Sequence, residues 1–314
     1  MKNNFTFFAG LKIAIVAVCC SLNAMAQPED KSYLKQANSD LKAGDYIPDS
    51  KYGPVVTPSN LTEALKNPAI YKSARFSNSG LTKFPEQVFS FPNIEELDIS
   101  QNTIKELPSN LNELQNLKEL HVNKNQLTSI GNEIILCSKL EVIQIQNNPL
   151  QSISKDIEKV ISLKEVTIGE VAKNCKVPVE LWNLTNLVKL KITNAGLTEI
   201  PASIAGLKRL GELCLANNSI SKIPEELYTL TDITYINLGG NKINSVSGSI
   251  KNLEHLYYLG VYYNPLKAFP EEIGNLKELA FLSCWKTNIP KSEVEKFRKK
   301  LPVADIHDTE TDLH

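Results

Sequence analysis

IEELDISQNTIKELPSNLNELQN at residues 94–116 and LGELCLANNSISKIPEELYTLTD at residues 210–232 share one pattern, L-x-x-L-x-L-x-x-N-x-L-x-x-I-P-x-x-I-x-x-L-x-x. The same pattern aligns the chain from residue 71 nearly to its end in rows of 23 residues, except that the row 163–186 has 24. Apolar and polar residues alternate around positions four to six, which is typical of a short strand with one buried face. No row can bury its apolar residues alone, so we expect the rows to stack on one continuous core. The rows begin at Tyr71, Ile94, Leu117, Leu140, Leu163, Leu187, Leu210, Ile233, Leu256 and Leu279.

This pattern resembles the leucine-rich repeat family, in its typical 23-residue form, across residues 71–301. The resemblance implies an α/β solenoid shaped as a horseshoe, with a parallel β-sheet on the concave side and short helical or 3₁₀ turns on the convex side. It also implies that the concave face binds a partner. Helical caps are expected at both ends of the array, because the open ends of a stacked core need covers.

Position nine of the row is asparagine in most rows. An amide at this place offers donors and an acceptor to backbone groups that are left open where the strand turns. A buried ladder of amides makes sense only if its hydrogen bonds are all satisfied. We therefore assign a structural role, and not a catalytic one, to Asn102, Asn125, Asn148, Asn218, Asn241 and Asn264.

The N-terminal segment, residues 27–70, carries a helix signal close to the first row. Asn60 and Glu63 have the spacing of an N-cap residue and its partner three residues on, and Pro68 would end the helix. We expect this short helix to cap the array.

The last row carries a second helix signal and is expected to form the C-terminal cap. Ser292 and Glu295 have capping-box spacing, and a helix here would turn Val294, Phe297 and Leu301 towards the open core. Residues 302–314, which follow the array, are expected to be a polar tail that frays.

The longer row, 163–186, is the irregular one. It has Val171 at position nine, and the next row has Ala195 there. The irregular stretch, Gly169–Pro178, is interpreted either as a tolerated insertion or as a bulge that recognises a partner, and the first interpretation is favoured.

The N-terminus reads as a secretory signal peptide, residues 1–26. Lys2 and Lys12 precede the apolar run Ile13–Leu22, which is too short to span a bilayer at roughly 20 residues. Small residues follow, so we expect cleavage after Ala26 and no transmembrane segment in the mature chain. Together with the repeats, this resembles an exported bacterial protein that is periplasmic, on the cell surface or secreted. A buried N-terminal helix, or lipid attachment at Cys19-Cys20, is the alternative.

Composition and motifs narrow the function. The 34 basic and 35 acidic residues give a net charge of −1, which argues against nucleic-acid binding and against a polybasic membrane patch. There is no glycine-rich phosphate loop, no H-E-x-x-H and no cysteine pair at zinc spacing, so no cofactor or metal is expected. The row register places the cysteines of the mature chain too far apart for disulfides, and we expect free thiols at Cys137, Cys175, Cys214 and Cys284.

Two arrangements could support catalysis. The register places Arg75, Asp98 and His121 in line on the concave face, but nothing supplies an oxyanion hole, so a charge ladder is the favoured interpretation. Cys214 lies beside Lys191, which would favour its thiolate. A hydrolase or an enzyme inhibitor is thus a minor alternative, and the main prediction is that the protein is not an enzyme.

The last rows carry aromatic residues at positions three and seven, which are expected to face solvent on the concave side. Only 7% of the chain is aromatic, and such exposed clusters are typical of interfaces. We therefore expect a scaffold that binds a protein or peptide here. A glycan stacking on the rings is an alternative ligand, and a cap or tail that covers the cluster is an alternative interpretation. The residues are Tyr235, Tyr258, Tyr262, Phe281 and Trp285.

Overall fold

The computed structural model describes residues 51–172 and 175–309. The described residues belong to one compact unit, Asp49–His314. The expected signal peptide, the segment that follows it up to residue 50 and the end of the expected tail, residues 310–314, lie outside the described residues.

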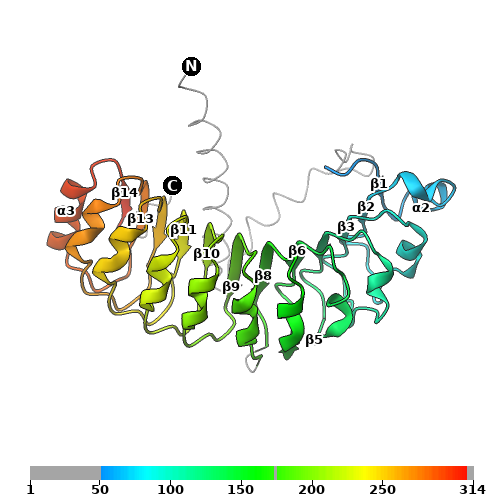
Figure 1. The fold of residues 1–314 in the computed structure, drawn as a ribbon, viewed down its shortest axis with the longest axis horizontal. Helices are drawn as coiled ribbons and strands as arrows, with labels where there is room; N and C mark the ends of the chain where they lie inside the picture. The colour runs from blue at the N-terminus through cyan, green and yellow to red at the C-terminus, as the bar shows by residue number, and fades with distance from the viewer. Residues whose placement is uncertain (1–50, 173–174, 310–314) are drawn as a thin grey trace, which may run out of the picture. The chain divides into compact units, whose positions relative to one another are not determined.

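Parallel strands stacked in chain order build the repeat array (Figure 1). Each strand pairs with its counterpart one row away, so that Leu97 lies opposite Leu120 and Tyr235 opposite Tyr258. This register confirms the parallel-sheet solenoid expected from the sequence. In the described residues the main sheet has twelve strands: β1 (Val55–Val56), β2 (Ser73–Arg75), β3 (Glu96–Asp98), β4 (Glu119–His121), β6 (Val142–Gln144), β8 (Glu165–Gly169), β9 (Lys189–Thr193), β10 (Glu212–Cys214), β11 (Tyr235–Asn237), β12 (Tyr258–Gly260), β13 (Phe281–Ser283) and β14 (Asp305–His307).

Short 3₁₀ helices form the outer side of the array, opposite the strands (Figure 1). A proline often precedes them, as Pro201 and Pro224 do, because its restricted φ suits the residue before the first turn. These helices confirm the short convex turns expected from the sequence. They are η2 (Pro68–Ile70), η3 (Glu86–Ser90), η4 (Leu111–Glu113), η5 (Asn132–Ile134), η6 (Lys155–Lys159), η7 (Val179–Asn183), η8 (Ala202–Gly206), η9 (Glu225–Thr229), η10 (Gly248–Asn252) and η11 (Glu271–Asn275).

The core lies between the sheet and the 3₁₀ helices. Leu97, Leu120 and Leu213, at position four of their rows, have no exposed surface. Burying such a side chain stabilises the fold by roughly 1.5–3 kcal/mol, and the pattern repeats in every row. The array therefore has one continuous core and not a series of separate ones.

The position-nine asparagines connect neighbouring rows, as expected. Asn148 is 1% exposed; its Oδ1 accepts the Leu127 N–H of the preceding row at 3.0 Å. Its Nδ2 donates to the Val122 carbonyl of the preceding row at 3.0 Å and to the Ile145 carbonyl of its own row at 3.0 Å. The same bonds recur at Asn102, Asn125, Asn218, Asn241 and Asn264.

Position eight of every row has a positive φ, which the sequence did not reveal. Left-handed backbone is unfavourable for residues with a Cβ atom, by roughly 1–2 kcal/mol. Here it turns the chain out of the strand, so that the next side chain, the asparagine of position nine, points inwards. The residues concerned are Asn78, Gln101, Lys124, Asn147, Glu170, Asn194, Asn217, Gly240, Tyr263 and Lys286.

The N-terminal cap differs from the expectation. The helix α2 (Leu61–Ala64) has no side-chain cap, so the expected pairing of Asn60 with Glu63 is wrong. The Asn60 amide instead accepts the Thr57 N–H at 2.8 Å and donates to the Val55 carbonyl at 2.9 Å. It thereby fixes the turn between β1 and α2, because an asparagine side chain competes well for nearby backbone groups.

The C-terminal helix α3 (Lys291–Lys300) covers the open core as expected. Val294, Phe297 and Leu301 are all nearly fully buried. The helix starts two residues earlier than the expected capping box would place it, however, with Pro290 as its N-cap and no side-chain cap. The expected capping box at Ser292 is therefore wrong, because this residue already lies inside the first turn.

The segment after α3 is more ordered than the expected polar tail. Residues 305–307 form β14, which pairs with β13 in parallel and ends the sheet. Ile306 is 2% exposed, and its carbonyl accepts an N–H from the Arg298 side chain at 2.9 Å. Arg298 also pairs with Asp308 at 2.6 Å, so the helix and the last strand hold each other in place.

A second, two-stranded sheet lies within the third and fourth rows. Its strands β5 (Ser129–Ile130) and β7 (Ser152–Ile153) pair in parallel, and Ser152 also bridges to Lys176 of the longer row. Residues 173–174 of the irregular stretch lie outside the described residues.

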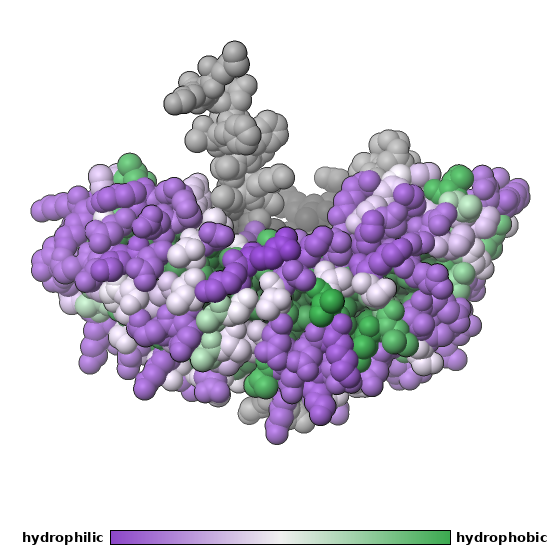
Figure 2. Space-filling view, in the orientation of Figure 1, coloured by the Kyte–Doolittle hydropathy of each residue, from purple (hydrophilic) through white to green (hydrophobic). Residues whose placement is uncertain are grey.

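The surface seen in Figure 2 is mainly hydrophilic, with apolar residues in small separate areas. The most exposed large apolar side chains are Ile161 and Val303, at 71% and 74%. Within residues 51–172 and 175–309, no helix combines the length and the apolar character needed to cross a membrane.

Candidate binding face of the sheet

The C-terminal end of the concave face carries an aromatic cluster, defined as Tyr235, Tyr258, Tyr262, Phe281 and Trp285. Tyr235 stacks on Tyr258, with ring centroids 4.5 Å apart and 9° between the planes. Tyr262 stacks on Trp285 at 5.3 Å and 6°. Phe281 lies in register beside Tyr258. The structure thus brings together the aromatic residues expected from the sequence, on the face opposite the leucine core.

Four of these rings are buried, whereas the sequence suggested an exposed platform. The residues Tyr235, Tyr258, Tyr262 and Trp285 are 3%, 7%, 4% and 3% exposed. Stacking explains part of this burial, since each ring covers one face of its neighbour. The expectation that the rings face solvent is therefore wrong for these four.

The accessible edge of the aromatic cluster consists of Phe281, which is partly exposed, and the adjacent Tyr263, which is 47% exposed. The Tyr263 ring meets Trp285 edge-on at 4.5 Å. The C-terminal tail touches the cluster through His307, whose ring lies 6.5 Å from that of Phe281. Phe281 and Tyr263 are therefore the accessible part of this aromatic surface.

Two glycines make room for the stacked rings. A Cβ atom on Gly239 would lie 2.2 Å from Cζ of Tyr262, and one on Gly260 would lie 2.9 Å from the Tyr258 hydroxyl. Between them, Asn237 has no exposed surface; its Nδ2 donates to the Tyr262 hydroxyl at 3.2 Å. The repeat pattern gives no role to Asn237, Gly239 or Gly260, although Gly239 falls at a position that is aromatic in the next two rows.

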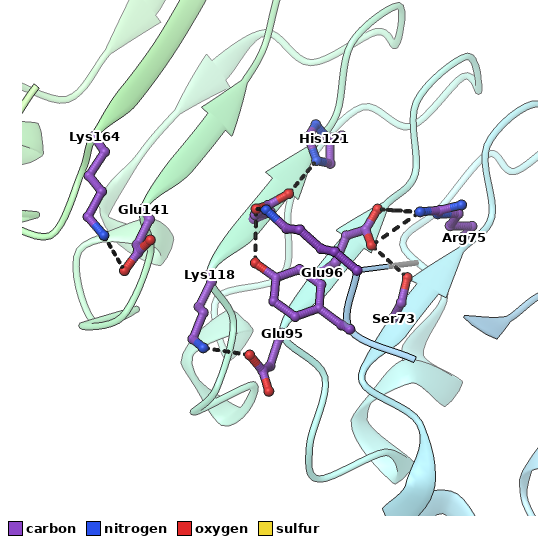
Figure 3. A network of polar contacts seen from close by, with 11 residues as sticks. Ser73, Arg75, Glu95, Glu96, Lys118, His121, Glu141 and Lys164 are labelled. Carbon is purple, nitrogen blue, oxygen red and sulfur yellow. Dashed lines mark hydrogen bonds and ion pairs between the residues drawn. The ribbon is translucent and has the colours of Figure 1, made fainter. Parts of the chain in front are cut away.

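The N-terminal end of the concave face is polar (Figure 3). Glu96 accepts a hydrogen bond from the Ser73 hydroxyl at 2.8 Å and pairs with the Arg75 guanidinium at 3.2 Å. Glu119, in the same column of the sheet, lies 3.5 Å from the His121 ring nitrogen. The contacts of Glu96 cross from β3 to β2, whereas the contact between Glu119 and His121 lies within β4.

Beside this column, charges of alternating sign follow one another from row to row. Lys118 pairs with Glu95 at 2.5 Å, and Lys164 pairs with Glu141 at 2.8 Å (Figure 3). The hydrogen bond from Lys118 outweighs burial and lowers the pKa of Glu95. The pairs are partly exposed, so each contributes little to stability, and together they give this edge a fixed charge pattern.

The geometry does not assemble the catalytic arrangement considered above. Asp98 and His121 are neighbours in the sheet, as expected. The ring nitrogen of His121 faces Glu119, however, and the Asp98 carboxylate accepts the Ser100 N–H at 2.9 Å. Hydrolysis by a serine, histidine and aspartate arrangement needs a histidine base that is oriented by the aspartate, and Asp98 and His121 do not form this contact.

The cysteines Cys137, Cys175, Cys214 and Cys284 are buried, and no disulfide joins any two of them within the described residues. Cys214 lies opposite Lys191 in the sheet but is only 4% exposed. Burial raises the pKa of Cys137 to about 11 and that of Cys284 to about 12, so both remain thiols at neutral pH. In residues 51–172 and 175–309, no group of three or more histidine, cysteine or acidic side chains is placed to hold a metal.

Comparison with known proteins agrees with this architecture. Residues 185–243 match a family model described as leucine rich repeat. The described residues therefore have the fold of a leucine-rich repeat solenoid. The matched family describes a repeat and not a catalytic domain. A search of curated proteins gives no match.

Several solved leucine-rich repeat structures are similar to the chain. The ectodomain of the receptor kinase GASSHO1/SCHENGEN3 from Arabidopsis thaliana, in complex with CASPARIAN STRIP INTEGRITY FACTOR 2, is 26% identical over 65% of this chain and 26% of that one, with a TM-score of 0.59. The ectodomain of the Arabidopsis receptor kinase HAESA, in complex with an IDA peptide hormone ligand, is 25% identical over 74% and 40%, with a TM-score of 0.64.

A bacterial leucine-rich repeat protein shares the fold as well. InlJ from Listeria monocytogenes is 20% identical over 76% of this chain and 47% of that one, with a TM-score of 0.60. The chain thus spans between about a quarter and a half of the length of these three structures.

Proposed function

We propose that this leucine-rich repeat solenoid is a non-catalytic scaffold that binds a protein or peptide on its concave face. The observation that carries the proposal is the aromatic cluster. Its rings lie on the face that the core does not use, and Phe281 and Tyr263 extend them to an accessible edge. Rigid aromatic side chains held in place by their neighbours are typical of interface hot spots. The complexes of the GASSHO1 and HAESA ectodomains with their ligands support the same use of this fold.

A protein or peptide fits the aromatic cluster better than a glycan does. Sugars bind aromatic side chains by stacking on a free ring face, but Tyr235, Tyr258, Tyr262 and Trp285 already stack on one another. At the cluster only Phe281, which is partly exposed, and the adjacent Tyr263 are accessible. A small apolar contact of this kind suits a side chain on the mixed apolar and polar surface of a polypeptide.

The test compares three forms of the full chain as bait in an extract of the source organism. One is the natural sequence, one carries Tyr263→Asn and Phe281→Ser, and the control carries Lys124→Asn. Tyr263 and Lys124 both have a positive φ at position eight, and asparagine suits that backbone at both sites. The control therefore places asparagine at the same row position and in the same backbone conformation, but far from the aromatic cluster.

We expect a partner that the natural chain and the control retain and the double variant loses. With the purified partner, calorimetry should show at least a thirtyfold loss of affinity for the double variant, equivalent to about 2 kcal/mol. Equal affinity of all three forms would place the binding site elsewhere on the array.

Export is part of the same proposal, and it is supported by the signal-like pattern of residues 1–26. Mass spectrometry of the protein isolated from its source should find Gln27 at the N-terminus. A mature chain that starts at Met1 in the cytoplasmic fraction would contradict it.

A further inference from the structure

The described chain begins on the concave face of the sheet. Val55 and Val56 pair with β2 at the edge of the sheet, and immediately before them Gly53 has a φ of 100°. This backbone, which favours glycine, redirects the chain across the sheet. The Tyr52 hydroxyl consequently reaches Glu119 of β4 at 2.9 Å, beyond β2 and β3.

Both residues that precede Gly53 converge on one carboxylate. The Tyr52 hydroxyl donates to Oε1 of Glu119, and the Lys51 ammonium donates to the same oxygen. The Glu119 side chain is 13% exposed. Burial by itself would raise the pKa of Glu119, but the hydrogen bonds from Lys51 and Tyr52 outweigh it, and the pKa is lowered. The carboxylate is therefore charged at neutral pH.

The tyrosine ring meets a second complementary group. Nζ of Lys118 lies 5.8 Å from the centroid of the Tyr52 ring, within the range of a cation–π contact. Burial, followed by the hydrogen bond to Glu119, raises the pKa of Tyr52 to about 12, so its phenol stays a donor throughout the physiological range. One carboxylate, Glu119, thus receives both the cation and the phenol, and Lys118 meets the ring face.

Glu119 differs from other carboxylates of its column in where its basic partner comes from. Glu96 pairs with Arg75 of the neighbouring strand, and Glu212 pairs with Lys189 of the neighbouring strand at 3.1 Å. Glu119 instead receives two donors from a segment that crosses over the sheet. A chain laid across the concave face is how an extended peptide partner would also approach.

We propose that Glu119 and Lys118 form a binding site for a lysine–tyrosine segment, and that Lys51 and Tyr52 are its resident occupant. The inference rests on the proposed function in one respect: a peptide partner that carries a basic residue next to a tyrosine would compete for this site. The occupant is displaceable, because the Lys51 side chain is 64% exposed and its ion pair is screened by solvent. Tethering nevertheless gives it an effective concentration in the millimolar range, so a free peptide competes poorly while it is in place.

The test uses a labelled peptide with the sequence of residues 49–54, Asp-Ser-Lys-Tyr-Gly-Pro, acetylated and amidated, and measures fluorescence anisotropy with the full chain. The receptor is a Lys51→Ala/Tyr52→Ala variant, in which the resident occupant is removed. We expect saturable binding to this variant with a Kd at least tenfold lower than that of the natural chain. Adding Glu119→Gln should abolish the gain, whereas the matched change Glu212→Gln should keep it.

A second measurement follows the natural occupant directly. Trypsin cuts after Lys51, and its contact with Glu119 should protect that bond. We expect cleavage between Lys51 and Tyr52 to be at least fivefold faster in Glu119→Gln than in the natural chain or in Glu212→Gln. Circular dichroism of each variant checks that the array is folded.

Equal peptide binding by the natural chain and the Lys51→Ala/Tyr52→Ala variant would overturn the inference. So would peptide binding that survives Glu119→Gln, or equal rates of cleavage. None of these results depends on the aromatic cluster. Failure of the partner capture would refute the proposed function and leave this site standing, and the reverse also holds.

Discussion

Replacing Asn148 by alanine should destabilise the array by about 3 kcal/mol. The substitution removes the acceptor of the Leu127 N–H and the donor to the Val122 and Ile145 carbonyls, each bonded at 3.0 Å. Asn148 is 1% exposed, so water does not replace these bonds without entering the core. An unsatisfied buried backbone group costs about 1–3 kcal/mol, and partial relaxation of three such groups gives about 3 kcal/mol in total.

The matched control is the neighbouring residue, Asn147. Its side chain is exposed, but its φ of 57° makes alanine a poor replacement, so the control is Asn147→Gly. This change removes an amide of the same size from the adjacent position and keeps the backbone conformation accessible. We expect it to alter the free energy of unfolding by no more than about 0.5 kcal/mol.

Urea denaturation followed by circular dichroism measures both variants. With a denaturant dependence of about 3 kcal/mol per molar, Asn148→Ala should lower the midpoint by about 1 M, and Asn147→Gly should leave it nearly unchanged. If the two midpoints coincide, or if Asn148→Ala lowers the midpoint by less than 0.2 M (roughly 0.5 kcal/mol), the asparagine ladder does not have the stabilising role assigned to it.

Three further predictions use the same denaturation assay. Leu259→Ala should cost about 2–5 kcal/mol, because this core side chain is 2% exposed and its truncation leaves a cavity; a cost below about 1 kcal/mol would contradict its place in the core. Gly239→Ala should destabilise the natural chain, because the new Cβ atom would lie 2.2 Å from the Tyr262 ring. The same substitution should lower the free energy of unfolding much less in a Tyr262→Ala background, and equal losses in both backgrounds would show that the ring is not the obstacle. The free energy of unfolding should fall between about pH 9 and about pH 12, with a slope of up to about 1.4 kcal/mol per pH unit. The reason is that burial raises the pKa of Cys284 to about 12, so the unfolded chain loses this proton at lower pH than the folded chain does. An unchanged decline in Cys284→Ala would assign the effect to other groups.

The repeat register could be predicted from the sequence because the same residue types recur at the same positions in each row. A leucine at position four, such as Leu97 or Leu213, is informative when the same residue recurs at the same spacing in row after row. The hydrogen bonds of Asn148 follow from the same repetition. Local geometry that repeats can therefore be predicted from the sequence with few physical assumptions.

What does not repeat was missed. β1 and β14 are strands of two or three residues outside the rows, and they form only because a neighbouring strand offers a free edge. The burial of the aromatic cluster depends on two glycines: Gly239 leaves room for the Tyr262 ring of the next row, and Gly260 leaves room for the Tyr258 side chain of the same strand. The contact of Tyr52 with Glu119 joins residues 67 positions apart, a separation at which one sequence carries no signal.

The small sheet of β5 and β7 has a mechanical consequence. A solenoid behaves like a spring whose coils touch only their neighbours, and it bends or stretches where those contacts are weakest. Between the third and fourth rows, backbone ladders run on two sides of the coil, and the bridge from Ser152 to Lys176 extends the second ladder into the longer row. Elastic deformation of the array should therefore concentrate on either side of this block, so that its two ends flex as separate arms about a stiff middle.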